Sequence, residues 1–124
     1  MNSFVDVLKA LSDVNRLRIM VTLLKSGKEL CICEIMDTLD IAQYNASRYV
    51  KELRTAGLLE ERREGRFVFY SVSKPQTDTE KYLLKTLETL EGGIIAEDRK
   101  RLAKRLAMRE NGKCVIGMRE SAEE

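Results

Sequence analysis

The chain has 124 residues, of which 44% are hydrophobic and 34% charged, and its formal net charge is +2. This length fits one compact domain, and the composition excludes wholesale disorder. Aromatic residues make up only 6% and Trp is absent, which argues against an all-β fold, while the small net charge means that affinity for nucleic acid must come from local basic clusters.

The first 27 residues are predicted to form two helices. Apolar side chains at positions 5, 8 and 11 mark a short amphipathic helix, and Ser12 and Asp13 end it and cap the helix that follows. In that second helix, four apolar residues between positions 17 and 24 have the i, i+3, i+4, i+7 spacing of one buried stripe. Gly27 then supplies the left-handed backbone that a helix C-terminus favours.

A short helix over Glu34–Leu39 and a longer amphipathic helix over Ala42–Ala56 are predicted next, with a turn at Asp40 between them. The period then changes from helical spacing to alternation. Two short strands are expected over Leu58–Arg62 and Arg66–Val72, joined by a glycine-containing turn at residues 63–65.

Helical spacing returns after Pro75. The stripe of Tyr82, Leu83, Leu87 and Leu90 runs up to a pair of glycines at 92 and 93, and an apolar stripe continues from there to about residue 109. A mainly α-helical fold with a small β-hairpin, in the order of a winged helix-turn-helix, is therefore expected. A small α+β domain with no role in nucleic-acid binding is the alternative that these patterns leave open.

The helix over Ala42–Ala56 carries a positive, amide-bearing face. Gln and Asn pair with adenine and Arg with guanine, so Gln43, Asn45 and Arg48 suit base readout in the major groove. Ser47 and Lys51 are better suited to phosphates. Although such a face can simply be solvated, arginines also surround the hairpin tip. Together they predict DNA binding, with the contact set Gln43, Tyr44, Asn45, Ser47, Arg48, Lys51, Arg63 and Arg66.

Three stretches resemble the ArsR/SmtB family of metal-responsive winged-helix repressors over about residues 5–72. They read LSDVNRLRIMVTLL, ELCICEIMDTL and ASRYVKELRTAGLLEERREGRFVFYSV. The tail segment NGKCVIG also resembles C-terminal ends of some arsenic-responsive members. Departures exist: Ala42 stands where the family usually has Ser or Thr, so the N-cap of the recognition helix must come from Asp40 or be missing. Tyr49 and Val50 replace the usual His and Leu, which changes packing more than chemistry.

The resemblance implies a homodimer that joins through its first and last helices and reads an inverted repeat in double-stranded DNA. The stripe that begins at Tyr82 agrees with this, because a small monomer has little left for it to cover, although it can also pack within one chain. Residues 1–110 are expected to form the DNA-binding and dimerisation domain, and residues 111–124 a flexible tail.

The chain has no His and three Cys. Without His, catalysis by Ser–His or Cys–His pairs and metal sites built on imidazole are excluded. Three Cys cannot be fully paired in disulfides within one chain. No stretch is apolar enough to cross a bilayer, and the N-terminus lacks the features of a signal peptide, so we expect a cytoplasmic protein with reduced thiols.

Cys31 and Cys33 form a C-x-C pair at the start of the third helix. In a regular helix, side chains at i and i+2 point about 200° apart. Binding of one ion by both thiolates therefore requires this segment to be non-helical or to unwind. Because the pair adjoins the helix that supports the recognition helix, local unwinding offers a hypothetical route from ligand binding to DNA release.

Thiolates without imidazole select soft ions. The candidates are As(III) or Sb(III), which take three thiolates, and Cd(II) or Pb(II), which prefer three or four. Where arsenic-responsive relatives often carry a third Cys, this chain has Met36. Cys114 is then the expected third ligand, from the same chain or its partner, although it can equally be an incidental thiol of the tail.

The sequence therefore predicts a repressor that leaves its operator when As(III) or Sb(III) binds, and no enzyme. Response to Cd(II) or Pb(II), or oxidation of the cysteine pair, is the alternative signal. A small thiol enzyme or metal carrier is the alternative class, but the chain has no C-x-x-C motif and no glycine-rich phosphate loop.

Overall fold

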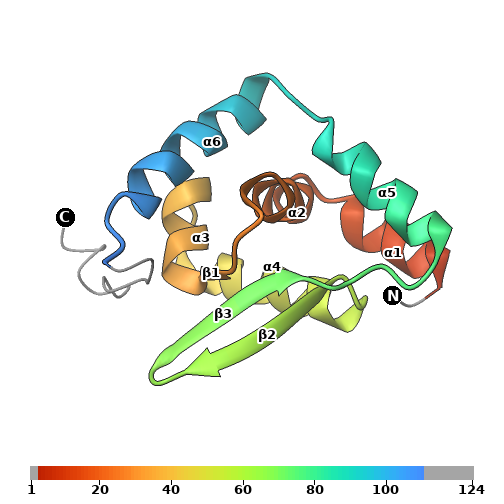
Figure 1. Cartoon of the computed structure of the whole chain (residues 1–124), viewed down its shortest axis with the longest axis horizontal. Helices are drawn as coiled ribbons and strands as arrows, with labels where there is room; N and C mark the ends of the chain where they lie inside the picture. Colours follow the sequence, from red (N-terminus) through yellow and green to blue (C-terminus); the bar gives the residue numbers. More distant parts are fainter. Residues whose placement is uncertain (1–2, 111–124) are drawn as a thin grey trace.

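The computed structural model describes residues 3–110. Six helices and one small sheet at the edge of the molecule form a winged helix-turn-helix, as expected from the sequence (Figure 1). No described helix is long and apolar enough to span a membrane. The elements in chain order are α1 Phe4–Leu11, α2 Val14–Ser26, β1 Leu30–Cys31, α3 Ile32–Leu39, α4 Gln43–Thr55, β2 Leu59–Glu64, β3 Phe67–Val72, α5 Asp78–Glu88 and α6 Gly93–Leu106.

The ends of α2 lie where the sequence places them. Asp13 is the N-cap, and its Oδ2 accepts hydrogen bonds from the backbone N–H groups of Asn15 at 2.9 Å and Arg16 at 3.0 Å. Gly27 closes the helix with φ 63°. These local caps need no tertiary contact, which is why sequence alone locates them.

The recognition helix α4 has Ala42 as its N-cap residue, and no side chain caps it. Asp40 instead ends α3 in the left-handed conformation, with φ 55°. Of the two possibilities that the sequence allowed, the structure therefore has the uncapped one. The N–H groups at this helix end stay available to an anion such as a DNA phosphate.

The sheet has three antiparallel strands in the order β1-β3-β2, one more than predicted. The extra strand is only two residues long, with Leu30 paired to Tyr70 and Cys31 to Phe69, so no alternation could reveal it. The hairpin turn also begins two residues later than expected. Glu64 pairs with Phe67, and Gly65 has φ 61° at the first central position, as in a type II′ turn.

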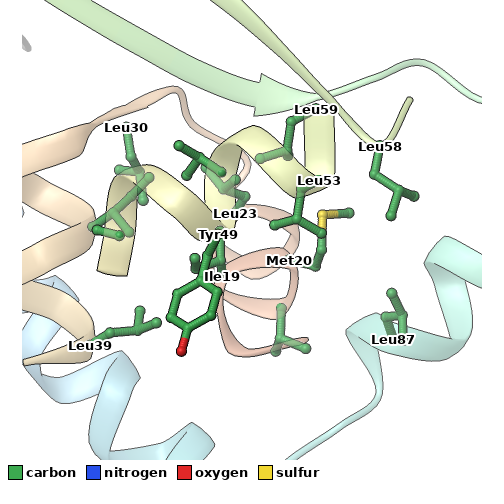
Figure 2. Close-up of a cluster of buried hydrophobic side chains, with 14 of the residues drawn as sticks. Ile19, Met20, Leu23, Leu30, Leu39, Tyr49, Leu53, Leu58, Leu59 and Leu87 are labelled. Atoms are coloured by element: carbon green, nitrogen blue, oxygen red, sulfur yellow. The ribbon is translucent and has the colours of Figure 1, made fainter. Parts of the chain in front are cut away.

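The core lies around α2, which contacts each of the other five helices. Figure 2 shows Ile19 and Met20 of α2 near Leu53 of α4, with Leu58 and Leu87 arriving from the start of the hairpin and from α5. Burial of this cluster holds the recognition helix and the wing on one scaffold.

The predicted stripe on α5 divides between core and surface. Leu87 is buried and Leu83 partly buried, whereas Tyr82 is 60% and Leu90 37% exposed, and the buried Leu84 is not part of the predicted stripe. The expectation that the stripe has little to cover within the monomer is therefore wrong for Leu87. Helix α5 packs on α2, and the exposed pair lies outside that contact.

Whether the last helix is continuous could not be read from the sequence. The structure breaks it: α5 ends at Glu88 and α6 begins at Gly93, with φ of 76° at Gly92 and 50° at Gly93. These left-handed conformations favour glycine. The break lets α6 turn away from α5 and lie along α3 (Figure 1).

A buried ion pair joins α6 to α2. Asp98 is 2% and Arg18 7% exposed. Arg18 Nε donates to Asp98 Oδ2 at 2.9 Å and Arg18 Nη2 to Oδ1 at 2.8 Å. Arg18 Nη2 also donates to the Leu39 carbonyl at 2.9 Å, so the same guanidinium caps the C-terminus of α3.

The wing is anchored at its base by Glu29 and Arg62. Arg62 donates to both carboxylate oxygens, at 2.8 to 3.1 Å, and its guanidinium lies 4.9 Å from the centre of the Phe69 ring. The hydrogen bonds from Arg62 hold the pKa of Glu29 below its usual range.

Asp98→Ala is expected to lower the free energy of unfolding by about 3–5 kcal/mol, because it leaves the Arg18 cation buried without its carboxylate. Urea unfolding measures this, with Glu97→Ala as the exposed control on the same helix. A loss below about 1 kcal/mol would show that the pair contributes little.

Glu29→Gln is expected to destabilise by less than about 1 kcal/mol at pH 7, since both partners are partly exposed. A carboxyl whose pKa is lower in the folded state stabilises the fold above its unfolded pKa and loses that contribution as pH falls through the folded value. The difference from wild type should therefore vanish well below pH of about 4. Glu60→Gln is the control. A difference between wild type and Glu29→Gln that persists at low pH would contradict the stabilising role given to the Glu29 carboxylate.

Candidate DNA interface and thiol site

The exposed face of α4 carries most of the predicted DNA contacts. Ala46, Tyr49, Val50 and Leu53 point into the core, which leaves the opposite side of the helix to solvent. Tyr44, 77% exposed, is the most open aromatic side chain of that side. Turns of 3.6 residues place the following predicted residues there together: Gln43, Tyr44, Ser47, Arg48 and Lys51.

Asn45 is placed differently from the other predicted contacts. It is only partly exposed and lies at the spacing i, i+4, i+7 with Tyr49 and Glu52, two residues of α4 that bond to α2. Its Oδ1 accepts from Arg48 Nη2 at 3.5 Å. Asn45 therefore lies at the edge of the exposed face, where it orients Arg48.

The wing adds a second basic point on the same side of the molecule. Figure 1 shows the β2–β3 hairpin extending beside α4, and the two contact each other at β2. Arg63 and Arg66 are exposed near its tip, with the Arg66 guanidinium 5.4 Å from the centre of the Phe67 ring. Arg62, in contrast, is bound to Glu29, so it anchors the wing.

The two cysteines of the C-x-C pair converge. Cys31 is the N-cap of α3 with an extended backbone, φ −81° and ψ 166°, and Cys33 lies in the first turn. Their Sγ atoms are 2.8 Å apart, longer than the roughly 2.05 Å of a disulfide bond. The divergence expected inside a helix does not apply, because the first cysteine precedes the helix. Of the two routes to chelation, the structure has the non-helical one and needs no unwinding.

The backbone at this point is held by Glu34, which is fully buried. Its Oε1 accepts from the Cys31 N–H at 3.1 Å, the carboxylate half of a capping box. Arg109 donates to both Glu34 oxygens at 2.7 Å and to the Glu29 carbonyl at 2.7 Å. The start of α3 is therefore fixed by an arginine that follows α6.

The sulfur atoms lie between aromatic rings and a cation. Cys31 and Cys33 are both buried against Phe69, with Phe67 beside them. Arg105 Nη2 lies 3.4 Å from Cys33 Sγ, and Arg105 Nε donates to Asp37 Oδ2 at 2.8 Å. A neighbouring guanidinium favours the thiolate, the form that binds soft ions.

Sequence reasoning missed these arginines. They recur at positions 101, 105 and 109, a spacing of four that places them on one helical face. That signal was available, but it does not tell which element the face meets.

Two buried cysteine sulfur atoms that converge beside a guanidinium are the donor type that soft ions prefer. Within residues 3–110, no group of three or more Cys, Asp or Glu side chains is arranged to hold one. Met36 packs against the main core and not against the cysteine cluster. Cys114, the predicted third ligand, lies outside the described residues.

Comparisons with known proteins bear on the family of this chain. A model described as "Bacterial regulatory protein, arsR family" matches residues 13–61. "Arsenic resistance transcriptional regulator ArsR2" of Pseudomonas putida is 41% identical over 68 residues, 55% of this chain and 58% of that protein. A cadmium resistance regulatory protein CadC homolog of Staphylococcus aureus is 36% identical over 66 residues, 53% of this chain and 54% of that one. The chain thus spans about half the length of several curated relatives it matches.

Two longer matches extend the likeness. "Uncharacterized HTH-type transcriptional regulator YceK" of Bacillus subtilis is 42% identical over 85 residues, 68% of this chain and 83% of that protein. The solved structure "Reduced HlyU" of Vibrio cholerae has a TM-score of 0.62 and 31% identity, and the match covers 72% of this chain and 88% of that one. These relatives are regulators and not enzymes. The winged helix with its C-x-C pair therefore belongs to the ArsR family of bacterial regulatory proteins.

Proposed function

We propose that this chain is a cytoplasmic transcriptional repressor that binds operator DNA as a homodimer and releases it when As(III) or Sb(III) binds to Cys31 and Cys33. The observation that carries the proposal is the 2.8 Å approach of two buried sulfur atoms at the start of α3. This helix packs against α4, so a change at the thiols has a direct path to the DNA-reading element.

Exposure and chemistry divide the DNA contacts into two groups. Gln43 and Arg48 read base edges in the major groove from the first turns of α4, and Asn45 supports Arg48 at its edge. The remaining candidate contacts position the domain on the sugar-phosphate backbone of the DNA; they are Tyr44, Ser47, Lys51, Arg63 and Arg66. The uncapped N-terminus of α4 adds backbone donors for one more phosphate.

The inducer is a soft ion, and the coordination number favours a metalloid. As(III) and Sb(III) take three thiolates, and this chain has three Cys. Cys114 completes the site, from the same chain or from its partner. Cd(II) or Pb(II) is the second candidate, favoured by the cadmium regulator among the relatives; these ions prefer three or four thiolates.

The dimer uses apolar side chains that the monomer leaves in solvent. Phe4, Val5 and Leu8 of α1 are 46–60% exposed, and Tyr82 and Leu90 near α5 add to them. Helices α1 and α5 both pack on α2. A two-fold axis through this surface pairs it with itself and sets two recognition helices about 34 Å apart, as an inverted repeat requires.

Arg48→Ala is expected to weaken operator binding by about 1–3 kcal/mol and to relax the base preference at one position of each half-site. Lys51→Ala should weaken binding to all sequences alike and reduce the slope of log affinity against log salt by about 1. Fluorescence anisotropy at several salt concentrations measures both, with Lys100→Ala on α6 as the charge-matched control. If all three variants behave alike, α4 is not the reading helix.

Arsenite should release wild-type protein from its operator, lowering the DNA affinity by roughly 5- to 150-fold. Cys31→Ser and Cys33→Ser should remain bound, because each removes one of the converging sulfurs. A parallel titration with Cd(II) identifies the ion. Cys114→Ser tests the third ligand, because a fully retained arsenite response would show that Cys114 is not part of the site. If arsenite still releases both Cys31→Ser and Cys33→Ser from the operator, the thiol mechanism is refuted.

A further inference from the structure

A row of arginines on α6 and just beyond it holds α3 along its whole length. Arg101 Nε donates to the Thr38 carbonyl at 2.7 Å, near the C-terminus of α3. Arg105 pairs with Asp37 in the second half of α3 and reaches Cys33 Sγ in its first turn, and Arg109 holds the buried Glu34 of the same first turn. Figure 1 shows α6 lying along α3. Cys33 is therefore part of the contact between two helices as well as half of the thiol pair.

Asp98 lies seven residues before Arg105, so both project from the same side of α6. It accepts two hydrogen bonds from Arg18 and one from Arg101 at 3.0 Å. Arg18 Nη1 in turn donates to Asn15 Oδ1 at 2.8 Å. The guanidinium of Arg18 is thus committed to three groups on three elements: Asp98, the Leu39 carbonyl and Asn15.

The same line of contacts reaches the recognition helix. Asn15 Nδ2 donates to the Tyr49 hydroxyl at 3.1 Å. Tyr49 is 8% exposed, and Figure 2 shows its ring in the core cluster with the hydroxyl directed away from Leu53 and Met20. The hydroxyl is the atom that connects α4 to Arg18 through Asn15.

We propose that Arg105 and Asp98 are positioning residues that couple the thiol site to the recognition helix, through α6, Arg18, Asn15 and the Tyr49 hydroxyl. This inference rests on the proposed function. An ion bound to Cys33 Sγ withdraws electron density and negative charge from the sulfur, which weakens the hydrogen bond that it accepts from Arg105. The contact between α6 and α3 then changes, and Asp98 carries the change through Arg18 to the side of α4 that faces α2. With Arg105 in place, the line holds α4 in its DNA-binding position.

A double-mutant cycle without any ion tests this line. Arg105→Gln and Tyr49→Phe, each alone and combined, are titrated with operator DNA by anisotropy. Residues that share no partner normally contribute additively. The proposal predicts that each single change weakens binding, and that the double variant is weaker than the worse single by less than a factor of about two, which is less than the product of the two single effects. Additive losses overturn it.

Controls separate positioning from general damage. Lys104→Gln removes the same charge from the preceding, exposed position of α6, and Tyr70→Phe removes a hydroxyl from β3. Lys104→Gln combined with Tyr49→Phe, and Tyr70→Phe combined with Arg105→Gln, should give additive effects on DNA affinity. Arg105→Lys keeps the charge and most of the stem but lacks the second nitrogen that reaches Cys33 Sγ, so it should recover only part of the affinity, whereas a role in packing alone predicts nearly full recovery. If Arg105→Gln does not fold, Asp37→Asn, at a partly exposed partner of Arg105, takes its place in the cycle.

An arsenite and Cd(II) titration of wild type, run beside the cycle, tests the proposed function separately. Binding of the ion is followed by thiolate absorption in the ultraviolet, without DNA. Tyr49→Phe should bind the ion with unchanged stoichiometry. The factor by which the ion lowers its DNA affinity should be smaller than in wild type by about threefold or more. An unchanged effect in Tyr49→Phe overturns the coupling. An ion that fails to release wild type refutes the inducer instead, and the ion-free cycle then decides whether the line of contacts exists.

Discussion

The buried ion pair of Arg18 and Asp98 determines how the last helix meets the rest of the protein. A charge as buried as Asp98 must be matched, and Arg18 matches it with two hydrogen bonds. Because the same guanidinium holds the end of α3 and Asn15, three elements cannot shift independently. The recognition helix, the thiol helix and α6 therefore form one hydrogen-bonded unit around α2, and a disturbance in one has consequences for the others.

The thiol site is built on a helix start, and this explains its chemistry. At an N-cap the backbone is extended, so Cys31 can face Cys33 across one residue, which a continuous helix forbids. The same helix end needs a carboxylate at Glu34 to satisfy the Cys31 N–H, and that carboxylate needs Arg109. One helical turn before Arg109, Arg105 lies beside Cys33 Sγ, where a guanidinium favours the thiolate. Structure and proposed chemistry share the same side chains.

DNA recognition depends on less of the molecule. The apolar side of α4 and the base of the wing set two basic points on one side of the domain. The Arg62–Glu29 pair engages a wing arginine that is not among the candidate contacts and fixes the strand that carries Arg63. A chain of net charge +2 can in this way present a positive surface.

Helix positions, the caps of α2, the exposed face of α4 and the C-x-C pair could all be predicted from the sequence, because each depends on residues within a few positions of one another. Three features could not be predicted from the sequence: the two-residue β1, the division of the α5 stripe between core and surface, and the position of Asn45 at the edge of the exposed face of α4. Each depends on which other part of the protein covers it. Most of all, the arginines at 101, 105 and 109 were visible as a row, but their partners lie more than sixty residues away. Sequence determined the local chemistry; only tertiary packing decided which guanidinium lies beside which sulfur, because that contact is made between helices that are far apart along the chain.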